Sequence, residues 1–204
     1  MVLDVSAAKV DRERLRSQIG SKYSDVALTP EKGFHFHTGR RLAVMLGYGE
    51  ADIDWLPEPT VASFAGTGNP FSQGPLRAGE VALDIGCGAG FDTLLAARQV
   101  GPAGAVIAID MTEPMLEKTR AGAQARGLGN VDARLGFAEE LPAESGSIDV
   151  VISNGVINLC PDKMGVMKEV YRVLRPGGRF QIGDIVVHKM VPQDAKDDID
   201  LWSG

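Results

Sequence analysis

Five short strand-like runs recur along the second part of the chain, and helix-like segments separate most of them. The runs cover 81–85, 105–110, 131–135, 148–153 and 179–187. Segments with helical spacing follow the first, second and fourth runs. Strands that alternate with helices of 10–15 residues form βαβ units, and right-handed crossovers arrange such units as a parallel sheet. We therefore predict an α/β fold with a Rossmann-like, doubly wound and mainly parallel sheet.

The first part of the chain has a different pattern. Helix-like charged stretches at 7–18 and 38–47 are separated by prolines and by a glycine-rich loop at 65–70. We expect residues 1–75 to form a helical or irregular N-terminal cover and residues 76–204 to form a cofactor-binding domain. His35 and His37 alternate with two phenylalanines, so both imidazoles lie on one side of an extended segment. They form either a substrate-facing pair or part of an exposed segment.

Composition excludes several classes of protein. The 27 acidic and 21 basic residues give a net charge of −6, which argues against nucleic acid as the main ligand. No apolar run approaches the roughly 18 residues of a membrane span, and the N-terminus has no apolar signal segment, so we expect a cytoplasmic protein. The cysteines Cys87 and Cys160 are too few for a disulfide framework and lack zinc-ligand spacing, so we predict no metal site.

The first apolar run leads into a turn that contains three glycines. Gly86, Gly88 and Gly90 allow a sharp turn and a close approach of the backbone to a ligand. In an open α/β sheet the ligand lies beyond the carboxyl ends of the strands, near the N–H groups of the following helix. Asp110 ends the second run twenty residues after Gly90, where its carboxylate can accept both hydroxyls of a ribose.

The spacing of the glycines separates two cofactor classes. A dinucleotide fingerprint, G-x-G-x-x-G, needs its third glycine at position 91, which is Phe91. The pattern found is G-x-G-x-G, with Asp84 two residues before the first glycine. A nicotinamide-dependent oxidoreductase on a similar sheet therefore remains the less favoured class.

Over about residues 76–187 the motifs resemble class I S-adenosylmethionine-dependent methyltransferases. The resemblance implies that Asp84 and Gly86 lie along the methionine portion of S-adenosylmethionine and Asp110 on its ribose, with Phe137 and Ala138 flanking the adenine. Many members have an acidic residue at position 137, so Phe137 removes a side-chain contact to the adenine amino group. The implied cofactor-binding residues are Asp84, Gly86, Cys87, Gly88, Gly90, Asp110, Met111, Phe137, Ala138 and Asn154.

A narrower resemblance is to the arsenite methyltransferases, carried by residues 100–102, 110–116, 151–163 and 198–204. Trivalent arsenic binds thiolates, and its free lone pair attacks the methyl group in line. The chain departs from this family at Gly155, where the family has a cysteine. A second cysteine is expected just after Gly204. The candidate catalytic residues are Cys160, as a substitute ligand, and Asn154; buried-cap and turn roles are their respective alternatives.

The resemblance implies methyl transfer to a metalloid or a small molecule. The alternatives are a C- or O-methyltransferase of the quinone-biosynthesis type and a cofactor-binding shell without catalysis. A full sheet of this class has two further strands, so the C-terminal strands are expected to be missing and the fifth strand to be uncovered. Uncovered edges pair readily, which favours a homodimer through this strand.

Overall fold

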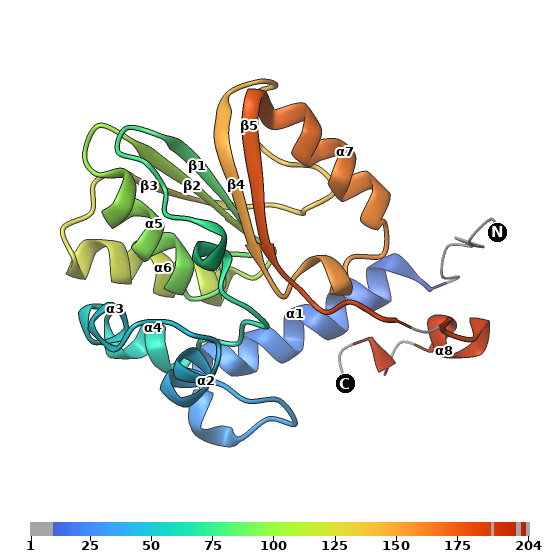
Figure 1. The fold of residues 1–204 in the computed structure, drawn as a ribbon. Coiled ribbons are helices and arrows are strands. Elements are labelled where there is room, and N and C mark those ends of the chain that lie inside the picture. Colours follow the sequence, from blue (N-terminus) through green and yellow to red (C-terminus); the bar gives the residue numbers. More distant parts are fainter. Residues whose placement is uncertain (1–9, 189, 199–200, 203–204) are drawn as a thin grey trace.

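The computed structural model describes residues 10–188, 190–198 and 201–202, and a five-stranded sheet forms its centre (Figure 1). All four strand pairings are parallel, in the order β3-β2-β1-β4-β5. The order reverses at β1, which makes the β1–β4 boundary the switch point of the sheet. The predicted fold class is confirmed. The strands are β1 (Val81–Ile85), β2 (Ala105–Asp110), β3 (Val131–Leu135), β4 (Ile148–Asn154) and β5 (Leu174–Gly183).

Helices cover both faces of the sheet because the central strands are apolar on both faces. On one face, α5 (Phe91–Val100) and α6 (Glu113–Ala125) pack against side chains such as Ala82, Val106 and Ala108. On the other, α7 (Lys163–Val173) packs against the alternate residues, including Leu83 and Val151. The period-two alternation of the strands thus divides one apolar run between two cores.

The fifth strand differs from the prediction of 179–187. It begins at Leu174 and ends at Gly183, so the Pro-Gly-Gly turn lies within it. The turn is accommodated as an irregularity, because the pairing with β4 jumps from Leu174 to Arg179 while β4 advances only from Ile148 to Val150. The residues beyond Gly183 leave the sheet, and three consecutive ones have exposed apolar side chains: Ile185, Val186 and Val187.

The N-terminal segment is more regular than predicted. Its helices are α1 (Arg12–Leu28), α2 (Gly39–Met45), α3 (Glu50–Trp55) and α4 (Glu58–Ala62). The longest, α1, starts at Arg12 because the Asp11 side chain caps it, accepting hydrogen bonds from the N–H groups of Glu13 and Arg14 at 3.0 and 3.1 Å. In Figure 1, α1 runs below the carboxyl end of the sheet. It therefore covers the region where a ligand is expected.

The edge strand β5 is partly covered by the chain itself. The 3-10 helix η2 (Pro70–Gln73) packs beside it, and Gln73 donates a hydrogen bond to the carbonyl of Ile182 at 2.6 Å. Gln181 in turn donates to the carbonyls of Pro70 and Gly74. Pairing of two copies through this edge stays a prediction. A short helix, α8 (Gln193–Asp197), follows near the C-terminus, and no helix among the described residues is long and apolar enough to cross a membrane.

Candidate functional site

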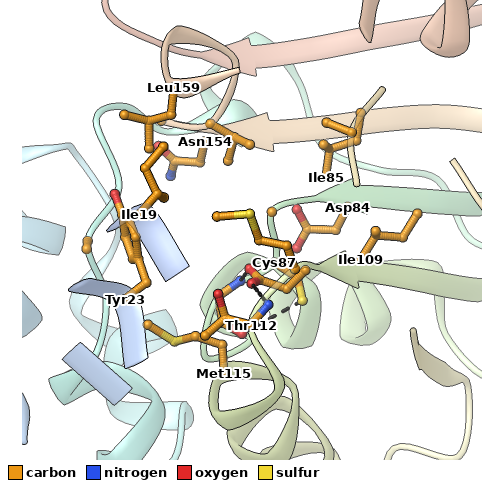
Figure 2. Close-up of a pocket in the computed structure, with 18 of the residues that line it drawn as sticks. Ile19, Tyr23, Asp84, Ile85, Cys87, Ile109, Thr112, Met115, Asn154 and Leu159 are labelled. Atoms are coloured by element: carbon orange, nitrogen blue, oxygen red, sulfur yellow. Dashed lines mark hydrogen bonds between the residues drawn. The ribbon is translucent and has the colours of Figure 1, made fainter. Parts of the chain in front are cut away.

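A pocket lies at the switch point, beyond the carboxyl ends of β1, β2 and β4 and against α1 (Figure 2). Nearly all of the predicted site residues line it, although they come from four separate stretches of the chain. Gly90 is the exception, since it lies behind the turn against Thr119. The predicted residues in the lining are Asp84, Gly86, Cys87, Gly88, Asp110, Met111, Phe137, Ala138, Asn154 and Cys160.

The glycines of the turn have different physical tasks. Gly86 has a φ of +68°, and a Cβ atom there would lie 2.3 Å from the side chain of Val156, so both its conformation and its packing exclude other residues. Gly88 has a φ of +52°, and a Cβ atom there would meet no atom within 4 Å. It faces open space, as a position that a ligand approaches closely should.

Asp110 is oriented by the backbone around it. Its Oδ2 accepts a hydrogen bond from the N–H of Gly88 at 2.9 Å, and its Oδ1 accepts one from the N–H of Thr112, also at 2.9 Å. Thr112 occupies the N-cap position of α6, and its side chain makes no capping hydrogen bond. Each carboxylate oxygen can accept a further hydrogen bond. The glycine turn and the end of β2 thus hold Asp110 ready for two hydroxyl donors.

Two further carboxylates lie in the pocket wall. Asp84 accepts a hydrogen bond from the hydroxyl of Thr93 at 2.6 Å, and burial, reinforced by the nearby charge of Asp92, raises its pKa to about 8. Burial also raises the pKa of Asp92, to about 6, while hydrogen bonds from Tyr48 and Asn154 oppose the shift. A cation in the pocket would favour the ionised form of these groups. The electrostatics therefore suit a positively charged ligand.

Asn154, predicted as a candidate catalytic residue, has its polar atoms committed to the protein. Its Oδ1 accepts hydrogen bonds from the N–H groups of Thr67 and Gly68 at 2.8 and 3.0 Å. Its Nδ2 donates to Asp92 at 2.9 Å, to the carbonyl of Gly68 at 2.9 Å and to the Tyr48 hydroxyl at 3.1 Å. Asn154 thus joins the end of β4 to α5 and to the loop at 65–69. The geometry gives it a structural task at the pocket wall.

Cys160 lines the pocket as a buried thiol. Its Sγ donates a weak hydrogen bond to the carbonyl of Val156 at 3.4 Å. Burial and the nearby Glu139 raise the pKa of this thiol to about 12, so it is neutral at physiological pH. Cys87 packs in the glycine turn beside Thr119, as expected, and its pKa is also raised by burial.

Gly155 stands where a side chain would meet an obstacle. Its φ is +71°, and a Cβ atom there would lie 3.0 Å from Cγ2 and 3.1 Å from Oγ1 of Thr67. Thr67 is itself fixed, because its N–H donates to Asn154 and its hydroxyl donates to the carbonyl of Gly183 at 3.3 Å. Any larger residue at 155 must therefore strain the backbone and displace Thr67.

Sequence reasoning missed the residues that α1 contributes. Arg16, Ile19 and Tyr23 lie on one face of this helix and line the pocket. Their spacing of three and four residues is the signal of such a face, but it does not show what the face covers. The histidine pair does not line the pocket: His35 and His37 are exposed. In the part of the chain that the structure describes, no cluster of three His, Cys, Asp or Glu residues could hold a metal ion.

A family model described as a methyltransferase domain matches residues 76–203, which include the sheet and the glycine turn. The chain belongs to this methyltransferase domain family. A curated arsenite methyltransferase from Halobacterium salinarum is 43% identical over 159 residues, 78% of this chain and 40% of that protein. Nocamycin O-methyltransferase from Saccharothrix syringae is 45% identical over 104 residues, 51% of this chain and 37% of that protein.

Solved structures agree with this assignment. An arsenic(III) S-adenosylmethionine methyltransferase from Chlamydomonas reinhardtii is 37% identical with a TM-score of 0.58, over 76% of this chain and 51% of that one. The predicted resemblance to S-adenosylmethionine-dependent methyltransferases is confirmed. This methyltransferase chain spans about 40% of the length of the curated relatives it matches. The face of α1 in the pocket lies outside the stretch that the family model matches.

Proposed function

We propose that the chain binds S-adenosylmethionine and transfers its methyl group to a small acceptor. The observation that carries the proposal is the coupling of the glycine turn to Asp110, whose carboxylate is fixed by the N–H of Gly88 at the switch point of the sheet. The family match and the names of the relatives support it.

The pocket residues suit the parts of this cofactor. Asp110 would accept the ribose hydroxyls, and Asp84 would face the methionine portion with its ammonium group. Phe137 and Ala138 would flank the adenine. Bound S-adenosylmethionine supplies an electrophilic methyl group on a sulfonium. The chain excludes water and aligns a nucleophile with that methyl group. Alignment is the main requirement when the transfer step needs no general base.

For the acceptor we propose a small organic molecule. The named relatives include both arsenite methyltransferases and enzymes for organic acceptors, among them a demethylmenaquinone methyltransferase from Lactococcus lactis. Arsenite binding needs two or three converging thiolates. Within the described part of the chain, Cys160 is a neutral thiol, and a Cβ atom at Gly155 would lie only 3.0 Å from the side chain of Thr67. Both observations favour an acceptor that is not held through sulfur.

Titration of the chain with S-adenosylhomocysteine and, separately, with NAD tests the cofactor. We expect saturable binding of S-adenosylhomocysteine and none of NAD. Binding should also release a proton, because the ammonium group of the ligand lowers the pKa of Asp84 from about 8. Affinity should therefore rise between about pH 6 and pH 8. Calorimetry in two buffers of different ionisation enthalpy measures the proton.

The pH dependence of the stability of the ligand-free protein provides an independent measurement of the raised pKa of Asp84. An ordinary Asp has a pKa of 3.8, so between about pH 4 and pH 8 the folded chain holds more protons than the unfolded chain, and its stability should fall as pH rises. Asp84→Asn should remove the proton release and the part of the slope between about pH 6 and pH 8, whereas Asp92, with its pKa raised to about 6, should maintain a slope at lower pH. Binding of NAD in place of S-adenosylhomocysteine would contradict the proposed cofactor. Transfer of a labelled methyl group to any acceptor would exclude a chain that binds the cofactor without catalysis.

Arsenite binding tests the acceptor. Equilibrium dialysis should show no saturation up to ~1 mM arsenite. A dissociation constant above that concentration means a binding free energy weaker than about −4 kcal/mol. Gly155→Cys alone should not improve binding, because the new side chain meets Thr67. Gly155→Cys combined with Thr67→Gly removes the obstacle and tests whether a thiol at 155 can work with Cys160. Tight binding by the unmodified chain would overturn the organic-acceptor proposal.

A further inference from the structure

Tyr23 brings a hydroxyl group to the pocket that no other described residue binds. The side chain lines the pocket from α1, and within the described part of the chain its hydroxyl has no hydrogen-bond partner. Its ring stacks on Phe36, with centroids 6.3 Å apart and planes at 24°, and packs against the buried cluster that contains Met115. Figure 2 shows the ring extending from α1 toward Ile19 and Leu159. These contacts fix the direction of the hydroxyl.

The carboxylates nearest to this hydroxyl already accept backbone N–H groups. Asp110 is bonded to the glycine turn and to the start of α6. Asp184, which follows β5, accepts from the N–H of Ile157 at 2.8 Å and from that of Ile185 at 2.7 Å. Burial, reinforced by the charges of Asp110 and Asp184, raises the pKa of Tyr23 to about 12. The phenol is therefore protonated at physiological pH, and its proton is available to a ligand.

The position of Tyr23 separates it from the cofactor-binding turn. Asp110 ends β2 and Asp184 follows β5, so a hydroxyl close to both lies above the two strands between them, β1 and β4. Figure 2 shows Tyr23 and Asp84 on opposite walls of the pocket. A cofactor that lies along Asp84 and the glycine turn would leave the opposite wall, with Tyr23, to face the acceptor.

The pocket wall offers no free cation to an acceptor. Among the described residues that line it, Arg16 is the single basic side chain, and it pairs with Glu139 at 3.3 Å and lies over the ring of Phe137. Four carboxylates line the same pocket, those of Asp84, Asp92, Asp110 and Glu139. An anionic acceptor would be repelled there. A neutral acceptor would instead gain contact with apolar side chains such as Ile19 and Leu159.

We propose that the Tyr23 hydroxyl donates a hydrogen bond to an oxygen atom of an uncharged organic acceptor, and that the pocket selects such a compound over the corresponding carboxylate. The inference rests on the proposed function, since it assumes that the cofactor occupies the wall opposite Tyr23. The hydroxyl orients the acceptor, and the surrounding carboxylates exclude its anionic analogue. Tyr23 is then a specificity-determining residue that lies outside the stretch matched by the family model.

The test uses two probes, 2-naphthol and 2-naphthoate, titrated by calorimetry into the chain saturated with S-adenosylhomocysteine. The wild-type chain should bind 2-naphthol at least tenfold more tightly than 2-naphthoate. Tyr23→Phe keeps the ring and removes the hydroxyl, so its affinity for 2-naphthol should fall about three- to tenfold, while its affinity for S-adenosylhomocysteine stays unchanged. Tyr171→Phe is the matched control, because Tyr171 is exposed on α7 and should affect neither affinity.

The outcomes separate this inference from the proposed function. A wild-type chain that does not bind S-adenosylhomocysteine contradicts the proposed function, and the inference fails with it. If S-adenosylhomocysteine binds, equal affinity for the two probes or absence of 2-naphthol binding overturns the selectivity, and this comparison needs no variant. A Tyr23→Phe chain that binds 2-naphthol as tightly as the wild type overturns the assignment of Tyr23. Weaker binding of S-adenosylhomocysteine by that variant also overturns it, because Tyr23 would then contact the cofactor.

Discussion

Replacing Asp110 by alanine should weaken binding of S-adenosylhomocysteine by about 1.5–3 kcal/mol, or roughly 10- to 100-fold, and calorimetry measures the change. Two losses combine. The ribose hydroxyls lose their acceptor, and the N–H of Gly88 loses the carboxylate that fixes the glycine turn. Asp132→Ala is the control, because Asp132 is an exposed carboxylate on the neighbouring strand β3. Its loss should not change the affinity.

A second substitution at the same position separates charge from geometry. Asp110→Asn keeps one acceptor oxygen but turns an amide NH₂ toward the N–H of Gly88 or of Thr112, where two donors would face each other. We expect its affinity to be as low as that of the alanine variant. An Asp110→Ala chain that folds and binds S-adenosylhomocysteine with unchanged affinity would remove Asp110 from the site.

Replacing Asn154 by alanine should lower the free energy of unfolding by ~3 kcal/mol, among the larger effects of single substitutions. The alanine leaves the N–H groups of Thr67 and Gly68 without their acceptor. Asp92, which is buried, loses one of its two side-chain donors. Urea unfolding of the empty protein measures the change, and Gln124→Ala, at an exposed position of α6, should have little effect.

The same variant distinguishes a structural from a catalytic Asn154. A chain that is as stable as the wild type but fails to transfer methyl groups would favour the catalytic role that the sequence indicated. Asn154→Asp is informative as well, since a carboxylate could still accept from the loop but would face Asp92. We expect it to be destabilised, and more strongly at higher pH as Asp92 ionises above its pKa of about 6.

The sheet could be predicted because its information is local. The three central strands are apolar runs, and the helices that follow them have their own periodicity. The fifth strand was wrong because its start is determined across the sheet: Arg175 pairs with Asp149 on β4, and the Pro-Gly-Gly segment bulges between two paired residues. Proline and glycine usually indicate the end of a strand, and only the pairing with β4 shows that this strand continues through them.

The site residues also divide into those that a local sequence pattern predicts and those that only long-range contacts bring together. Gly88 and Asp110 could be predicted because a turn and a strand end at fixed spacing bring them together. Arg16 and Glu139 are 123 positions apart, and nothing in either local pattern indicates that they meet. The hydrogen-bond partners of Asn154 could not be predicted for a related reason. Its partners lie in a loop that precedes the sheet, so its amide had no visible binding partner in the sequence.

The packing of the N-terminal loop bears on how this protein can be divided. Gly66 lies against the Asn154 amide, and Gly68 meets Gly183 so closely that a Cβ atom on Gly68 would be 2.8 Å from the Cα of Gly183. A recombinant fragment cut where the family similarity begins, at residue 76, would lose this loop and the α1 face together. We therefore expect that a fragment intended for expression or for exchange in protein engineering must extend upstream of residue 76 and include α1.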